Sequence, residues 1–242
     1  WMQFLIFFFP ILIGTFFQQM YNTIDAVVVG RFAGTEALSS VGGAAAQIIN
    51  LAVGFFTGLT AGGSVLISQY YGAGNREKLD VALHTSYGFG LLGGIIIGIT
   101  GIIVTPNLLV ALNSPPEIMP LSSVYVRVYF GGIVFVFIYN MGSSILRALG
   151  DSRRPLYYLI VCCLVNIVLD LLLVIVLHLG VLGVAVATLI SQGISAVLVT
   201  LTLMHHTKEL KLDLHRIRSD RGMLGNILGI GLPSGIQSSM YS

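Results

Sequence analysis

Charged side chains are scarce in this 242-residue sequence, because Asp, Glu, Lys and Arg together make up only 9% of it. Soluble domains carry about 25% charged residues, so the shortage excludes the ordinary soluble classes. Hydrophobic residues make up 55% of the chain, and the mean hydropathy is +0.91. A net charge of +2 is too small to suggest a nucleic acid partner. The balance predicts a protein that crosses a membrane several times.

Cysteine and catalytic motifs are scarce as well. Cys162 and Cys163 are adjacent in an apolar run, without metal-ligand spacing and too close along one helix for an easy disulfide, so we interpret them as core thiols. We find no phosphate-binding loop, no His/Cys metal cluster and no nucleophile elbow. We therefore expect a protein that is not an enzyme and has no cofactor.

Apolar stretches of membrane-spanning length are abundant. They predict an all-α polytopic membrane protein with six transmembrane helices, near 4–29, 41–71, 82–111, 120–148, 155–178 and 181–204. The segments 30–40, 72–80, 113–117 and 150–155 carry turn residues or charge and are predicted as loops. We expect an N-terminal six-helix lobe at 1–204, a cytoplasmic linker at 205–224 and the start of a seventh helix at 225–242. Because that last run weakly resembles the first one, we interpret the chain as one lobe of a larger protein.

The positions of the cations predict the orientation in the membrane. If the N-terminus is cytoplasmic, ten of the twelve Lys and Arg residues lie on the cytoplasmic side, and only Arg31 and Arg127 lie outside. Cytoplasmic loops of membrane proteins are enriched in these residues. We therefore predict a multi-pass protein of the cell membrane with its N-terminus in the cytoplasm.

Two acids stand out because they fall inside predicted spans. Asp25 lies on the first helix with Gln18, Tyr21 and Asn22, spaced by threes and fours, so these side chains share a face. Asp170 shares a face of the fifth helix with Asn166. A charge near the bilayer centre costs about 2.5 to 3.5 kcal/mol or more and marks a functional site by default. We expect these polar faces to meet across a wet interior.

The chemistry of such a site leaves two ions open. A carboxylate in a low-dielectric interior takes up a proton more readily than one in water, whereas carboxylate and amide oxygens also suit a hard cation such as Na⁺. The structural alternative is that these groups only hold helices together through hydrogen bonds. That alternative carries more weight for the hydroxyls, such as Thr188, than for two ionisable acids.

Several segments together resemble one transporter family. They are Pro10 through Asp25 with the following 28–34, the segments 69–75 and 147–155, and the pair of Asn166 and Asp170. In this order and spacing they are similar to the multidrug and toxic compound extrusion (MATE) family over the whole chain, as its N-terminal lobe.

The resemblance implies a fold and a set of site residues. Members have twelve helices in two lobes around a central cavity, so the C-terminal lobe is expected as a missing partner. The resemblance implies a cation site of Asp25, Asn166, Asp170 and Thr188, which would also hold any bound Na⁺. It further implies Gln18, Tyr21, Asn140 and Tyr125 as cavity residues, and Pro10 as a hinge.

We therefore predict an antiporter that exports amphipathic or cationic drugs and is driven by H⁺ or Na⁺. One alternative is a flippase for lipid-linked oligosaccharides, whose cavity should be cationic, whereas these spans are expected to hold acids and no central Arg or Lys. A passive channel or a non-transporting scaffold is the other alternative, and a channel should show rings of equivalent residues from an oligomer.

Overall fold

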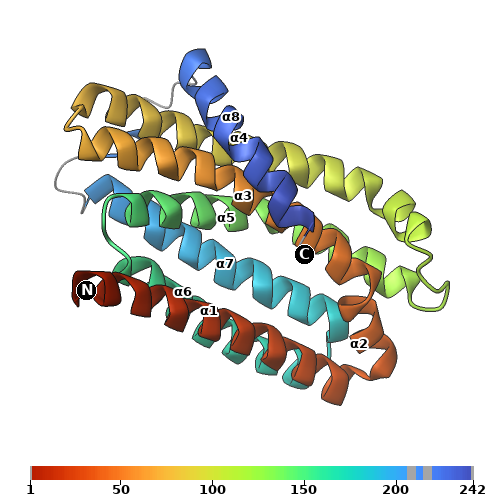
Figure 1. Cartoon of the computed structure of the whole chain (residues 1–242). Helices are drawn as coiled ribbons and strands as arrows, with labels where there is room; N and C mark the ends of the chain where they lie inside the picture. The colour runs from red at the N-terminus through yellow and green to blue at the C-terminus, as the bar shows by residue number, and fades with distance from the viewer. Residues whose placement is uncertain (1, 206–210, 215–219, 241–242) are drawn as a thin grey trace.

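The computed structural model describes residues 2–205, 211–214 and 220–240, with side chains from residue 8 onward, and these residues form helices and no strands (Figure 1). In chain order the elements are α1 (Met2–Val28), η1 (Val29–Ala33), α2 (Thr35–Gly42), α3 (Ala44–Gly72), α4 (Arg76–Ala111), α5 (Met119–Ala148), α6 (Arg153–Asp170), η2 (Leu171–Val176), α7 (Gly180–His205) and α8 (Arg221–Met240). The all-α fold predicted from the sequence is confirmed.

Helix α5 lies at the centre of the bundle. It packs against α3, α4 and α7, while α1 and α6 pack together on the far side of α7 and α8 crosses α3 (Figure 1). The ring of Phe56 on α3 stacks between those of Phe89 on α4 and Phe137 on α5. This arrangement leaves the face of α1 that carries Asp25 turned toward the other helices.

The number of membrane spans is close to the predicted six. By length and composition alone, five stretches of the described chain are suited to cross a membrane: Thr35–Gly72, Arg76–Ala111, Met119–Ala148, Arg153–Val176 and Gly180–His205. Helix α1 has 27 residues and therefore also has the length to span, although its described part is not among the five.

Two predicted loops are largely helical. Segment 72–80 was predicted as a loop because it is charged, but α4 already begins at Arg76, where the side chain of Asn75 accepts a hydrogen bond of 3.1 Å from the backbone N–H of Lys78. Segment 30–40 contains most of η1 and the start of α2. In both segments turn residues are present, yet the charged residues beside them are good helix formers.

The described part of the predicted linker, 211–214, is fastened to the bundle. The backbone N–H of Leu212 donates to the carbonyl of Leu203 at 3.0 Å, and the Leu212 side chain is buried. The backbone N–H of Asp213 donates to Nε2 of the buried His84 at 3.0 Å, while Nδ1 of that ring lies 2.9 Å from the carbonyl of Asp80. His84 therefore carries its proton on Nδ1, because Nε2 acts as the acceptor. Segments 206–210 and 215–219 lie outside the described residues.

This contact leads to a local prediction. In His84→Phe the N–H of Asp213 loses this acceptor, and a donor deprived of its partner costs about 1–3 kcal/mol. We expect amide hydrogen exchange at Asp213 to become roughly tenfold faster or more. His205→Phe is the matched control, because the hydrogen bond of that exposed ring within the described residues goes to the carbonyl of Leu201 on its own helix. Equal exchange at Asp213 in all three proteins would show that the ring does not hold the linker.

Candidate functional site

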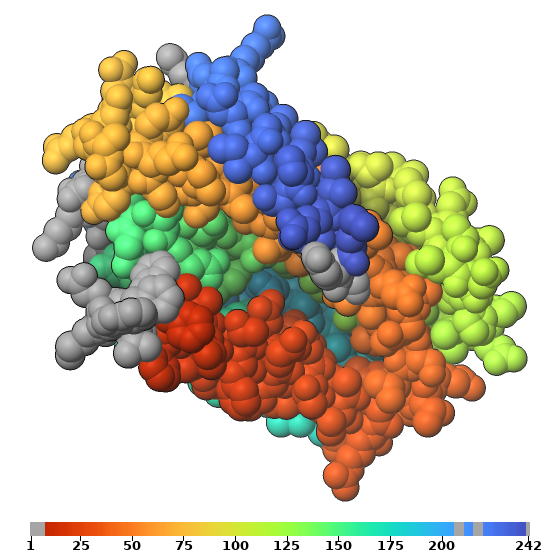
Figure 2. All heavy atoms as spheres, in the orientation of Figure 1, coloured from red at the N-terminus to blue at the C-terminus, as the bar shows by residue number. Residues whose placement is uncertain are grey.

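A cavity of about 520 Å³ lies between α1 and α3, with walls that also come from α2, α5, α6 and α7. In Figure 2 it appears as a hollow between the red α1 and the orange α3, with atoms of α7 visible at its floor. Its lining combines aromatic residues with amide, hydroxyl and charged side chains. Ligand sites in proteins commonly have this mixture of apolar walls and a few polar groups.

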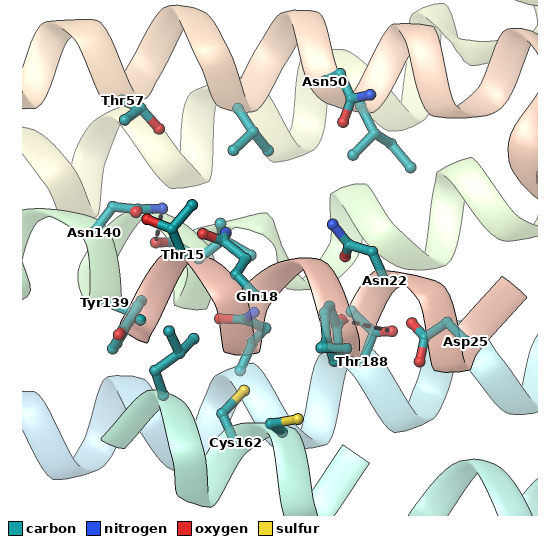
Figure 3. A pocket seen from close by; sticks show the side chains of 18 of the residues that line it. Thr15, Gln18, Asn22, Asp25, Asn50, Thr57, Tyr139, Asn140, Cys162 and Thr188 are labelled. Atoms are coloured by element: carbon teal, nitrogen blue, oxygen red, sulfur yellow. Dashed lines mark hydrogen bonds between the residues drawn. The ribbon is translucent and has the colours of Figure 1, made fainter. Parts of the chain in front are cut away.

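The polar face of α1 points into this cavity. Gln18, Tyr21, Asn22 and Asp25 all line it, and Figure 3 shows Gln18, Asn22 and Asp25 in a row along the helix. The phenol of Tyr21 donates a hydrogen bond of 3.3 Å to Oγ1 of Thr188 on α7. The spacing of polar residues on α1 thus predicted one face, and the fold turns that face into the cavity, where Tyr21 reaches α7.

Asp25 and Asp170 form a pair of buried carboxyl groups. They come from α1 and α6, and they are near enough to interact directly, by charge and by side-chain contact. Asp25 is 9% exposed, and Asp170 is fully buried. Among the described atoms, one carboxyl oxygen of Asp25 and both of Asp170 have no hydrogen-bond partner. Two ionised carboxylates supply only acceptors, so neither can satisfy the other.

Asn166 and Thr188 are the other two residues predicted for this site. Asn166 is fully buried one turn before Asp170 on α6, and neither its amide oxygen nor its amide nitrogen has a partner among the described atoms. Native structures leave few buried polar groups unpaired, and each exception calls for an explanation such as an ion that binds there. Carboxylate, amide and hydroxyl oxygens are the ligand types that a hard cation uses.

Both acids sit where an α-helix passes into a π-helical segment. Asp25 lies near the end of α1, which η1 follows directly, and Asp170 is the last residue of α6 before η2. The two π-helical segments contact each other and α7. Gly183 permits the approach of α7, since a Cβ there would lie 3.2 Å from the backbone of Leu173. Short π-helical segments frequently occur at functional sites, and the sequence carried no signal for these two.

The opposite end of the cavity is polar as well. Figure 3 shows Tyr139 and Asn140 of α5 well away from Asp25 along α1. The phenol of Tyr139 donates to the carbonyl of Pro155 at 3.1 Å, and Nδ2 of Asn140 donates to the carbonyl of Val136 on its own helix at 2.9 Å. Arg147, in the last turn of α5, also lines the cavity. We expected no Arg or Lys in the centre of the spans, and Arg147 lies at the end of α5, so this cation, which was counted with the cytoplasmic loops, adds a positive charge at the end of the cavity.

The structure divides the predicted site residues into two groups. Those that line the cavity are Pro10, Gln18, Tyr21, Asp25, Tyr125, Asn140 and Thr188. Asn166 and Asp170 are buried and do not line the cavity, but Asp170 interacts with Asp25, which does. Helix α1 runs without interruption through Pro10. The free thiols Cys162 and Cys163 are buried as predicted, but they also form part of the cavity wall.

Sequence reasoning missed two cavity residues of α3. Asn50 and Thr57 line the cavity together with Ile49 and Val53, and Figure 3 shows both polar side chains on the helix facing α1. Their seven-residue separation places them on one helix face. This spacing inside an apolar run was the signal that could have identified them.

Comparisons with known proteins agree with this arrangement. The family model described as MatE matches residues 10–172. The chain is 29% identical over its whole length to the probable multidrug resistance protein YoeA of Bacillus subtilis, and 31% identical over 97% of its length to the probable multidrug resistance protein YpnP of the same organism. It covers 54% and 52% of these two proteins, so it spans about half the length of the curated relatives that it matches.

The fold gives the same answer. A crystal structure of MATE in the bent conformation superimposes on 97% of this chain with a TM-score of 0.89 at 28% identity, and the chain covers 52% of that protein. The similarity therefore reaches one half of a known transporter fold, as expected for an N-terminal lobe. The chain, a multi-pass membrane protein, belongs to the MatE family of transporters.

Proposed function

We propose that this chain is the ion-coupling lobe of a multidrug efflux antiporter that is driven by H⁺ or Na⁺. The observation that carries the proposal is the buried pair of Asp25 and Asp170, with carboxyl oxygens that lack partners among the described atoms. Asp25 also lines the large cavity, so an ion bound by the pair lies next to the space open to a substrate. The names of the relatives YoeA and YpnP, which are multidrug resistance proteins, support the same role.

The coupling follows from the charge of the pair. Without an ion, two buried carboxylates repel each other across α1 and α6. A proton shared between them, or a Na⁺ also held by Asn166 and Thr188, removes this repulsion and draws the two helices together. Because η1 and η2 follow the acids and contact each other, the change is transmitted to the helix ends. An ion drives transport only if it binds the inward-open and outward-open states unequally.

The cavity fits an amphipathic, cationic substrate. Tyr21, Tyr125 and Tyr129 give it aromatic walls near Asp25, and aromatic faces attract organic cations. We place the N-terminus in the cytoplasm on the distribution of the cations, and we assign Pro10 as the hinge of α1, since proline removes a helix hydrogen bond. The relatives' names favour drug export over the flipping of lipid-linked oligosaccharides.

The test is uphill transport in vesicles that contain the protein. We expect a cationic dye such as ethidium to move against its own gradient when an opposing Na⁺ gradient is imposed at constant pH, or when an opposing pH gradient is imposed without Na⁺. The arm that drives movement identifies the ion. Dye that only equilibrates, at the same rate with and without either gradient, would instead indicate a channel or a protein that does not transport.

A further inference from the structure

Arg147 places a positive charge in the same cavity that Asp25 lines. Tyr125 and Tyr129 on α5 interact electrostatically with Asp25, so this part of α5 marks the acidic end. Tyr129 and Arg147 are 18 positions apart on the helix, which corresponds to about 27 Å at 1.5 Å per residue. The cavity wall is thus acidic at one end and basic at the other, and the two charges are too far apart to pair.

Among the described residues, Arg147 forms no ion pair with an acid. The ion pairs among described residues join His84 with Asp80 and Arg154 with Asp151. Asp151 is the acid next to Arg147 in the sequence, but its side chain already accepts hydrogen bonds of 3.1 Å from the backbone N–H groups of Arg153 and Arg154. Its carboxylate therefore caps the start of α6, and no other acid in the part of the chain that the structure describes pairs with Arg147.

Among the described residues, the surroundings of Arg147 favour its positive charge but provide no acid to pair with it. Arg147 lies in the last turn of α5, where the helix dipole favours a cation. Tyr139 is its electrostatic neighbour, but the proton of that phenol is already donated to the carbonyl of Pro155. A guanidinium has five N–H donors, and in a cavity it is suited to bind a carboxylate or phosphate through two parallel hydrogen bonds.

We propose that Arg147 is an anion subsite at this end of the cavity, and that it binds the carboxylate or another acidic group of an amphipathic substrate. The inference rests on the proposed function in that the ligand is a transported molecule. Because about 27 Å of helix separates the two charged ends, a drug-sized molecule contacts one end at a time. Arg147 therefore admits zwitterionic and anionic amphiphiles that the acidic end alone would repel.

A matched pair of dyes tests this subsite. Rhodamine 110 carries a free carboxylate, and rhodamine 123 is its methyl ester, so the two differ only in the group that Arg147 should bind. With purified protein in nanodiscs, we expect Arg147→Gln to raise the Kd for rhodamine 110 by about tenfold, in line with the loss of a charge-assisted hydrogen bond. The Kd for rhodamine 123 should change less than about twofold. Arg147→Lys keeps the charge without the planar fork, so its Kd for rhodamine 110 should lie between those of the unaltered protein and of Arg147→Gln.

The control is Arg153→Gln, which removes an exposed cation near the same end of the bundle that does not line the cavity. It should leave both Kd values unchanged. Equal changes for the two dyes, no change for either, or no binding of either dye to the unaltered protein would overturn the subsite. If Arg147→Gln does not fold, Arg147→Lys is used in its place. The subsite then requires that this variant raise the Kd for rhodamine 110 relative to that for rhodamine 123, and an unchanged ratio of the two Kd values would overturn it.

Binding in nanodiscs needs no ion gradient, so the proposed subsite and the proposed function can be rejected independently of each other. Dye discrimination by Arg147 without any gradient-driven transport would leave the subsite and reject the antiporter. Gradient-driven export with no discrimination between the two dyes would reject the subsite and leave the antiporter.

Discussion

Asp25→Asn and Asp170→Asn should each abolish most of the gradient-driven dye export. Asparagine has nearly the shape of aspartate, but it neither takes up a proton nor supplies the negative charge that holds a cation. Coupling between two sites is typically worth 1–3 kcal/mol, or about 5- to 150-fold in affinity. We expect the rate of gradient-driven export to decrease by a factor of this size. The measurement is ethidium export from vesicles at matched protein levels, with and without the driving gradient.

The removal of one acid also relieves the repulsion between the pair, so the variants should be at least as stable as the unaltered protein. This combination separates a functional pair from a structural one, because loss of a structural contact would lower both export and stability. Glu36→Gln is the control, since Glu36 is exposed in the first turn of α2. Export that keeps its full rate and its ion dependence in both Asp variants would exclude the pair as the coupling site.

Gly58→Ala and Gly62→Ala should separate α8 from α3. A Cβ on Gly58 would lie 2.4 Å from the Cα of Gly235, and one on Gly62 would lie 2.1 Å from the carbonyl oxygen of Ile227. Both obstacles are backbone atoms, so no rotation of a side chain relieves them. Overpacking costs typically 1–3 kcal/mol and occasionally more, and we expect each variant to lose at least this free energy of unfolding, measured by SDS titration in mixed micelles.

The same two helices provide matched controls. Gly72 at the end of α3 and Gly229 in α8 have no atom within 4 Å of an added Cβ. Gly72→Ala and Gly229→Ala should therefore be neutral or stabilising by up to about 1 kcal/mol, because alanine is the better helix former. If all four variants were equally stable, glycine would not be what holds α8 on α3. A small-residue stripe containing Gly58 and Gly62 was visible in the sequence, but its partner helix was not.

Helix positions were predicted well where an apolar run decides them. The expected spans at 120–148 and 181–204 correspond within a residue to α5 and α7, because bilayer thickness sets the length of an apolar helix. The prediction failed at charged helix ends. Arg76 to Asp80 extend α4 beyond its apolar part, and hydropathy cannot separate a charged loop from a helix that continues into water.

The candidate site was predicted in part. Asp25, Asp170 and Asn166 were identifiable because polar groups are costly in a bilayer, and the family resemblance added Thr188. Arg147 was missed because it lies near a loop, where a cation is ordinary. Whether the two acids faced each other also remained an expectation, since spacing along one helix says nothing about the rotation of its neighbour.

The sequence by itself determined that the chain is an all-α membrane protein, which of its residues are too polar for lipid, and which family it resembles. These properties depend on composition and on the order of residues along single helices. Only the tertiary structure decided that Asp25 meets Asp170 beside π-helical segments, that Arg147 shares their cavity, and that α8 packs on α3. The reason is that these contacts join residues far apart in the chain, and side-chain packing between helices sets the rotation and depth of each helix.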